Sequence, residues 1–145
     1  MSKYSTNSTQ FKESGLLVAA LIEMGFAVDQ IEVNQTAQQL FDYQGRATTY
    51  LDKTGDKAEI IIRKQHVGCA ANDIGFRRNE NGRFEAIISA FDSSSNRYNS
   101  EWLGKLTGAY ARQGVIAKML KQGYRYAGPK KVGNRTELSF VTNKA

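Results

Sequence analysis

Hydrophobic and polar positions alternate in two segments that flank Asn81-Gly82. Residues 73–80 precede this dipeptide and residues 83–91 follow it, and the second segment is apolar on both faces. An Asn-Gly pair between alternating segments is typical of a two-residue type I′ turn, because both central residues of that turn need positive φ. The pattern therefore predicts a β-hairpin whose second strand lies inside a sheet.

A two-residue turn also fixes which residues of this hairpin face each other. It predicts Arg78 opposite Glu85, and it places Arg77 opposite Ala86 with no carboxylate directly across. Opposite-charge pairs across a sheet contribute roughly 0.2–1 kcal/mol each, so we interpret Arg78 as an ion-paired residue. Arg77 is a candidate ligand contact, although a solvated surface arginine explains it as well.

Two segments carry apolar residues at helical spacing. The first begins near Ser14 and ends at Gly25, and the second follows Asn99 or Ser100 and ends at Gly123. In each case a polar residue can cap the first turn, and a glycine can take the left-handed conformation after the last turn. The second helix also contains three glycines that we interpret as points of close packing against the sheet: Gly104, Gly108 and Gly114.

The remaining segments predict further strands and one connection, and residues 34–43 favour no particular element. Ile60-Ile61-Ile62 is apolar on both faces and is expected inside the sheet. Residues 34–43 are polar and rich in glutamine, and residues 92–100 are rich in Ser and Asn, which is typical of a mobile connection. The other expected strands cover residues 4–11, 27–33, 46–52 and 57–64, followed by a final hairpin of residues 124–127 and 136–142 around a basic loop, residues 128–134.

Together these elements predict an α+β fold that forms a single domain over residues 1–145. We expect a mainly antiparallel sheet of six to eight strands, with two helices packed on one face. The chain has 145 residues and is 41% hydrophobic, which is enough for one sizeable core. The second face of the sheet would then be open to a partner or covered by residues 34–45 and 92–99.

The net charge of +6 is unevenly distributed along the chain. Residues 97–145 hold ten Lys and Arg against two Glu, whereas residues 1–96 hold ten basic and twelve acidic residues. A basic segment of this kind suits an acidic macromolecular partner, and a role in solubility alone explains it equally well. The candidate partner-binding residues are Arg77, Lys118, Lys121, Arg125, Lys130 and Lys131.

Residues that support catalysis or metal binding are scarce. His66 and Cys69 are the only His and Cys, too few for a tetrahedral zinc site, and Cys69 is expected in the core. No phosphate-binding glycine loop is present, and the Asp residues fall mostly at turns and strand ends, where local backbone bonding explains them. We therefore expect no cofactor, no metal and no enzymatic activity.

The sequence also bears on where the protein works. Its first residues lack the apolar core of a signal peptide, and the apolar run of residues 15–22 is too short to span a bilayer. A single cysteine cannot form an internal disulfide, which agrees with a reducing compartment. We expect a soluble protein of the cytoplasm, with no membrane partner.

Asp73-Ile-Gly-Phe-Arg-Arg-Asn79 followed by Gly82 resembles a motif of the hypothetical chloroplast reading frame thirty-five family, found in cyanobacteria and some plastids. The chain departs from this family at residues 92–96, where members usually carry tryptophans, and at residues 65–71, which are longer. These departures suit a divergent member, such as one from a virus of such a host. The family's function is uncharacterised, so the resemblance implies a fold and a cytoplasmic or stromal setting without catalytic residues. Further similarity lies in residues 2–6 and 9–10, Tyr43–Arg46, Tyr110-Ala111 and Gln122–Tyr124.

Three function classes are compatible with these observations. The first is a small non-enzymatic accessory or regulatory protein that docks on an acidic protein through its basic C-terminal third. The second is a single-stranded nucleic-acid-binding protein, because aromatic and basic residues interleave between Arg97 and Tyr126 and could stack bases and hold phosphates. Trp102 and Tyr110 lie at helical spacing, however, where core packing explains them. An enzyme acting on an anionic substrate is the third and least favoured class.

Overall fold

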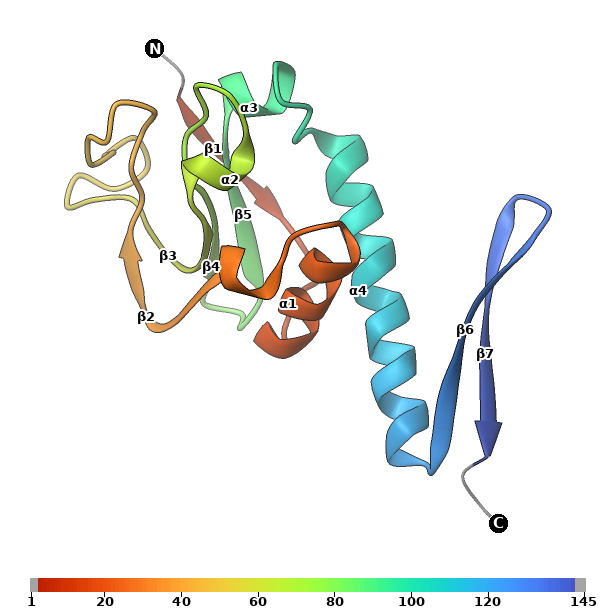
Figure 1. The fold of residues 1–145 in the computed structure, drawn as a ribbon. Coiled ribbons are helices and arrows are strands. Elements are labelled where there is room, and N and C mark those ends of the chain that lie inside the picture. The colour runs from red at the N-terminus through yellow and green to blue at the C-terminus, as the bar shows by residue number, and fades with distance from the viewer. Residues whose placement is uncertain (1–2, 143–145) are drawn as a thin grey trace.

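The structure, a computed structural model, describes residues 3–142 and shows the predicted α+β fold (Figure 1). Five strands form an antiparallel sheet, and the last two described strands form a separate hairpin. The elements are β1 (Tyr4–Ser8), α1 (Ser14–Glu23), the 3-10 helix η1 (Val28–Gln30), β2 (Glu32–Gln39), β3 (Lys57–Ile62), α2 (Lys64–Val67), β4 (Ile74–Arg78), β5 (Phe84–Ser89), α3 (Ala90–Ser94), α4 (Ser100–Lys121), β6 (Tyr124–Val132) and β7 (Arg135–Thr142).

The strand order of the larger sheet is β1-β5-β4-β3-β2, and neighbouring strands are antiparallel. β3 and β5 thus lie inside the sheet, as their apolar character on both faces predicts. The prediction of one sheet with six to eight strands is wrong, because β6 and β7 pair with each other and not with the five-stranded sheet. The long helix α4 carries the chain past the end of the sheet before β6 begins (Figure 1).

The main core lies between one face of the sheet and the two helices α1 and α4, which confirms that both helices pack on one face. α1 contributes Leu17 and Leu21, and α4 contributes Leu106 and Ala109, all of them fully buried. Burial of each leucine stabilises the fold by roughly 1.5–3 kcal/mol. Trp102 and Tyr110 pack against this core.

Local chemistry sets both ends of α1. The prediction that Ser14 caps the helix is wrong: Glu13 occupies the N-cap without a side-chain bond, and the Tyr110 hydroxyl accepts from its backbone N–H at 3.0 Å. At the other end Gly25 has φ 118°, and the Phe26 N–H donates to the Leu21 carbonyl. This is a Schellman ending, as the sequence predicts.

The opposite face of the sheet is covered by residues 40–56. Leu40 is buried in a second, smaller cluster with residues of β1, β3 and β5, and the Tyr50 ring meets Tyr4 edge-on at 6.2 Å. Residues 92–99 are not the predicted mobile connection. Asp92 is fully buried within α3, and its carboxylate accepts hydrogen bonds from the backbone N–H of Asn72 and the hydroxyl of Ser89.

The β4–β5 hairpin exists as predicted, but its register is shifted by one residue. Arg77 lies opposite Glu85, so the predicted pairing of Arg78 with Glu85 is wrong. The loop has three residues: the Asn79 N–H donates to the Arg83 carbonyl, and Gly82 alone in the loop has positive φ, at 76°. The Asn79 side chain accepts from two backbone N–H groups of the loop, which favours this longer loop over a type I′ turn.

Three other strand predictions are corrected by the structure. Residues 27–33 form η1 and the start of β2, and residues 46–52 form no strand. β3 pairs with β2, across a register shift, rather than with residues 46–52. The predicted basic loop of residues 128–134 is mostly strand, since β6 and β7 turn at Gly133 and Asn134. In the first two cases pairing with residues distant in the chain decided the outcome. In the third case the pairing is local, across the Gly133-Asn134 turn.

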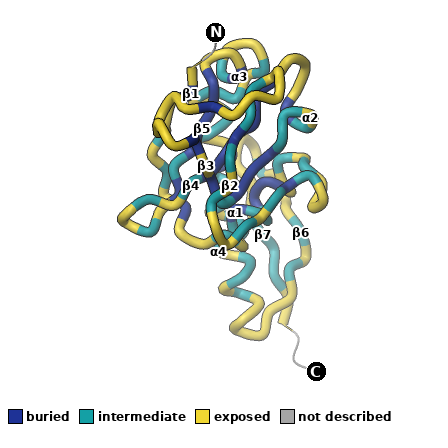
Figure 2. The backbone as a smooth tube through the Cα atoms, turned by 90° about the vertical axis from the view of Figure 1, so that its left-hand side faces the viewer, coloured by how far each residue is buried: buried dark blue, intermediate teal, exposed yellow. Residues whose placement is uncertain are grey.

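The molecule divides into a body, residues 3–110, and an arm, residues 111–142. The body contains the five-stranded sheet, both clusters of buried residues and the first half of α4. The arm contains the second half of α4 and the β6–β7 hairpin, and none of its residues is buried (Figure 2). Within residues 3–142 no helix is both long and apolar enough to cross a membrane.

Candidate partner-binding surface

The arm begins where α4 leaves the core. α4 has 22 residues, a length of roughly 33 Å. Asn99 caps its first turn by accepting from the Trp102 N–H at 3.1 Å, and Gly123, with φ 90°, follows its end, as the sequence predicts. Ala109 is the last buried residue of the chain's described part. The rest of α4 therefore extends beyond the sheet with no buried residue (Figure 1).

One ionic contact joins the body to the start of the arm. The Glu23 carboxylate, at the end of α1, accepts from the guanidinium of Arg112 at 2.5 and 3.0 Å and from the amide of Gln113 at 3.0 Å. Desolvation by itself would raise the pKa of Glu23, but the hydrogen bonds from Arg112 and Gln113 and the charge of Arg112 outweigh it and lower this pKa. The contact fixes α4 against the end of α1.

The β6–β7 register gives the hairpin two different faces. Tyr126 lies opposite Phe140, with ring centroids 5.4 Å apart, and Pro129 lies opposite Leu138. A bulge between these two pairs restores the alternation, so Tyr126, Phe140 and Leu138 share one face. We call this the apolar face of the hairpin.

The other face of the hairpin carries most of its charge. It presents Arg125, Lys130 and Arg135, together with Glu137, which pairs with Arg135 at 3.3 Å. We call this the basic face. Lys131 lies on the apolar face, since consecutive residues of a strand point to opposite sides. The hairpin is thus amphipathic, although both faces are at least partly open to solvent.

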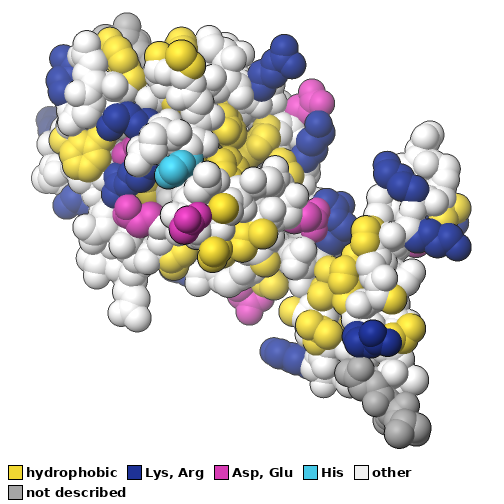
Figure 3. Space-filling view, in the orientation of Figure 1, with side chains coloured by type: hydrophobic (Ala, Val, Ile, Leu, Met, Phe, Trp, Pro, Cys, Tyr) yellow, Lys and Arg dark blue, Asp and Glu magenta, His cyan; other side chains and the backbone are white. Residues whose placement is uncertain are grey.

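The arm contains five of the six predicted partner-binding residues. Lys118 and Lys121 lie in the last turn of α4, where their positive charges also interact favourably with the helix dipole. Arg125 and Lys130 are about five residues apart on β6, roughly 17 Å, so the charges form a stripe along the arm rather than a point cluster. All five side chains, Lys131 included, are exposed, and none makes an ion pair within residues 3–142 (Figure 3).

Charge therefore differs sharply between the two regions. The arm holds seven basic residues against one acidic residue, Glu137, whereas residues 3–110 hold twelve basic and thirteen acidic residues. Exposed apolar side chains accompany the charge, and Figure 3 shows them gathered along the arm. The large apolar residues of the arm that are more than a third exposed are Val115, Leu120, Tyr124 and Val141.

Arg77 does not belong to this surface. It lies on β4 of the body, and its guanidinium is 3.8 Å from the Glu85 carboxylate directly across the hairpin. The prediction that no carboxylate lies directly across from Arg77 is wrong, because the register differs from the predicted one. Arg78 instead lies over the Phe84 ring and donates to the carbonyls of Lys12 and Gly82.

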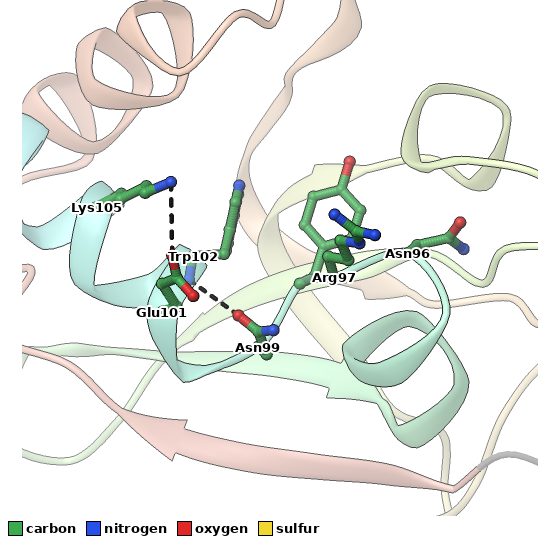
Figure 4. A pocket seen from close by; sticks show the side chains of 7 residues that line it. Asn96, Arg97, Asn99, Glu101, Trp102 and Lys105 are labelled. Atoms are coloured by element: carbon green, nitrogen blue, oxygen red, sulfur yellow. Dashed lines mark hydrogen bonds and ion pairs between the residues drawn. The ribbon is translucent and has the colours of Figure 1, made fainter.

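A cleft of about 340 Å³ lies where α4 begins (Figure 4). Arg97, in an unusual left-handed conformation with φ 63°, and the partly exposed Trp102 line this cleft. Lys105 is 3.8 Å from Glu101, so one of its two cations already faces a carboxylate. The cleft could hold a planar, weakly anionic group. Its lining residues are Asn96, Arg97, Tyr98, Asn99, Glu101, Trp102 and Lys105.

The buried polar residues of the body hold the fold together. The Asp73 carboxylate accepts from Arg63, from the Phe41 N–H and from the Lys64 N–H, each at 2.8 Å. Arg63 also pairs with Glu32, and this contact is the main cause that lowers the pKa of Glu32. These bonds join segments up to 32 residues apart, so Asp73 departs from the predicted local bonding. Asp42, Asp52 and Asp56 do accept from nearby backbone N–H groups, as the sequence predicts.

The single cysteine is placed differently from its prediction. Cys69 is a free thiol at the surface, whereas the sequence predicts it in the core. It follows the short helix α2 in a segment that turns outward, next to Ala70 with φ 54°. Among residues 3–142, no three His, Cys, Asp or Glu side chains are grouped closely enough to hold a metal ion.

The apolar component of the arm was not predicted from the sequence. Tyr126, Leu138 and Phe140 alternate with polar residues as they would in any half-buried strand, so their pattern predicts a place in the main sheet. The sequence contained one signal that β6 and β7 lie outside the main sheet. The basic residues are concentrated after residue 110, which is unusual for two strands that pack on a core.

Comparison with known proteins places the chain in a family. A family model described as "Protein of unknown function (DUF1257)" matches residues 20–136, which include most of the body and most of the arm. A search of curated proteins found no match. A search of solved structures found none either.

Proposed function

The chain belongs to the DUF1257 family of proteins of unknown function, and from its structure we propose a non-enzymatic accessory protein that docks on an acidic macromolecular partner through its arm. The observation that carries the proposal is the arm's composition. Seven basic residues and four exposed large apolar side chains occupy a 32-residue segment with no buried residue. A solvated surface needs the charge but not the apolar side chains.

The stability of the arm supports the same proposal. A two-stranded hairpin is at best marginally stable in water unless it packs against another element. β6 packs against α4, yet Tyr126, Leu138 and Phe140 remain partly exposed. A partner that covers these side chains and neutralises the neighbouring lysines and arginines would stabilise the arm.

The test is affinity purification from an extract of the native host, with and without nuclease. We expect nuclease-resistant recovery of an acidic protein, reduced by the double substitution Lys130→Thr with Lys131→Thr. Both lysines are exposed and make no ion pair with residues 3–142, so the free energy of unfolding should change by less than about 0.5 kcal/mol. Recovery should also fall as the salt concentration rises, because exposed charges are screened.

The matched control is Lys53→Thr with Lys57→Thr. These two exposed lysines lie in the body, and their replacement removes the same charge. The control should bind like the unaltered protein. Equal recovery by the arm variant and the control would contradict the proposal.

Single-stranded nucleic acid is the second candidate partner, and the cleft at the start of α4 is the observation that favours it. Trp102 could stack on a base there while Arg97 holds a phosphate. Trp102 is, however, partly packed against the main core, and its ring meets Tyr98 at 4.9 Å. Loss of all recovered material after nuclease treatment would favour this candidate.

An enzyme acting on an anionic substrate remains the third candidate, and no observation favours it over the other two. A narrower placement of the protein also stays a proposal. The resemblance to the hypothetical chloroplast reading frame thirty-five family suggests a cyanobacterial, plastid or viral origin and a cytoplasmic or stromal location.

A further inference from the structure

We infer that the arm binds an extended acidic protein segment in which acidic and apolar residues alternate, added as a third strand to the outer edge of β7. This inference rests on the proposed function and specifies the partner's chemistry and the way it binds. Three observations carry it: the free edge of β7, the two-faced character of the hairpin, and the charge of the arm.

The outer edge of β7 is suited to strand addition. β7 has eight residues, and on one side it pairs with β6; no strand within residues 3–142 pairs with the other side. An unpaired edge presents a row of backbone N–H and C=O groups that can bind another strand. β6 is less suitable, because Pro129 lacks an N–H and because this strand lies against α4.

The two faces of the hairpin define the side chains of the added strand. A strand paired with β7 would place alternate residues on each face of the enlarged sheet. Residues on the apolar face would cover Leu138 and Phe140. Residues on the basic face would lie beside Arg135 and its partner Glu137, with Arg125 and Lys130 of β6 one strand further in. The first set should therefore be apolar, and the second set should be acidic.

The charge of the arm argues against two other occupants. A second copy of the arm would bring two segments of like charge together, each with seven basic residues and one acidic residue. Nucleic acid would neutralise the charge but would leave the apolar face uncovered. An alternating acidic and apolar strand satisfies both faces at once.

The experiment compares synthetic nine-residue peptides in binding to the full-length protein. The first alternates Glu or Asp with Val or Leu. The second has the same composition, arranged as one acidic block and one apolar block. The third has the first sequence with alternate backbone amides N-methylated, and oligothymidylate is the fourth probe. Calorimetry at two salt concentrations measures each affinity.

We expect the alternating peptide to bind at least about tenfold more tightly than the block and N-methylated peptides, a difference of ~1.4 kcal/mol. Leu138→Thr should weaken its binding with little change in salt dependence. Lys130→Thr should weaken it and also reduce the salt dependence, since a charge contact is lost. The control substitution Lys53→Thr, which removes one exposed lysine of the body, should change neither the affinity nor its salt dependence.

Five results would overturn the inference, and four of them are comparisons. They are equal affinity for the alternating and block peptides, equal affinity for the N-methylated peptide, tighter binding of oligothymidylate, and a concentration-dependent dimer in sedimentation that the peptide dissociates. Absence of binding by the alternating peptide would also overturn it. The proposed function is judged separately, by recovery of the partner with the Lys130→Thr and Lys131→Thr variant.

Discussion

The body and the arm use similar elements with different results. Each contains helix and antiparallel strands, and each contains phenylalanine, leucine and tyrosine. In the body these side chains are enclosed between layers, and Phe76 and Leu17 have no exposed surface. In the arm the same residue types remain partly exposed, and Leu120 is 51% exposed.

The difference in exposure between the two regions follows from how many sides of each sheet are covered. The five-stranded sheet is covered on one face by α1 and α4 and on the other by residues 40–56, so its apolar residues meet apolar neighbours in every direction. The hairpin β6–β7 has α4 on one side only (Figure 1). The body therefore encloses most of its large apolar side chains, whereas the arm leaves several of its own partly exposed.

The largest expected effect comes from the same substitution made in each region. Phe76→Ala should lower the free energy of unfolding by about 3–5 kcal/mol, because it leaves a cavity in the main core. Phe140→Ala should lower it by about 0.5–1.5 kcal/mol, mostly through loss of the ring contact with Tyr126. Urea unfolding of both variants measures the two losses. Equal losses of unfolding free energy in the two variants would mean that Phe140 is packed as tightly as Phe76.

Glycine substitutions should change stability in opposite directions. Gly75→Ala would place a Cβ 2.7 Å from the Cβ of Ala58 and 3.0 Å from Leu40, and should cost about 1–3 kcal/mol. Gly114→Ala in the arm meets only Leu16, at 3.8 Å, and should stabilise α4 by up to ~1 kcal/mol. Thermal unfolding of the two variants tests the pair. A loss of stability for Gly114→Ala would show closer packing of the arm than the structure has.

Gly104 and Gly108 also show how closely α4 packs. A Cβ at Gly104 would meet nothing within 4 Å, and one at Gly108 would meet only the Arg112 guanidinium. The prediction that the glycines of α4 mark close packing against the sheet is therefore wrong. Gly104→Ala is the matched control for Gly114→Ala, because it makes the same change in the body's half of α4.

The contact between Glu23 and Arg112 should contribute less, and its contribution should depend on pH. The pKa of Glu23 is lower in the folded protein, so the contact stabilises the fold above the ordinary pKa of glutamate and is lost as pH falls through the lowered value. Glu23→Gln should therefore cost up to about 1 kcal/mol at pH 7, since the pair is partly exposed. The variant and the unaltered protein should become equally stable in strong acid.

Urea unfolding at pH 7 and at low pH measures this difference. Glu101→Gln is the control, because it removes an exposed pair with Lys105 at 3.8 Å within a single helix. A stability difference for Glu23→Gln that does not depend on pH would contradict the ionic explanation.

The smallest effect should come from Arg77→Ala. The pair with Glu85 is long, at 3.8 Å, and both side chains are partly exposed, so the loss should be roughly 0–1 kcal/mol. Recovery of the partner should not change, because Arg77 is in the body and outside the arm. Reduced recovery would extend the binding surface to the β4–β5 hairpin.

Local signals in the sequence predicted local structure well. Gly25 and Gly123 end their helices, Asn99 caps α4, and Ile60, Ile61 and Ile62 lie inside the sheet. Each of these outcomes depends on residues within one or two turns or on continuous apolar character, so the chain itself contains the information.

Structure that depends on distant residues was predicted less well. The Asn81-Gly82 pair fits both a two-residue and a three-residue loop, and the Asn79 side chain decides between them. The separation of β6–β7 from the main sheet could not be predicted, because it reflects contacts that are not formed. Of the candidate site, the charged residues of the arm were found from composition, and its apolar residues were not.

The continuity of α4 has a geometric consequence for any assembly that the protein joins. The same helix is fixed in the core at Leu106 and supports the arm from Ala111 onward. Each helical residue turns the chain by about 100° and advances it by about 1.5 Å. Deleting one residue near Gly114 would therefore rotate the hairpin about the body by that angle, whereas inserting seven residues, about two turns, would nearly restore the orientation at a greater distance. α4 thus sets both the rotation of the hairpin about the body and its distance from the body.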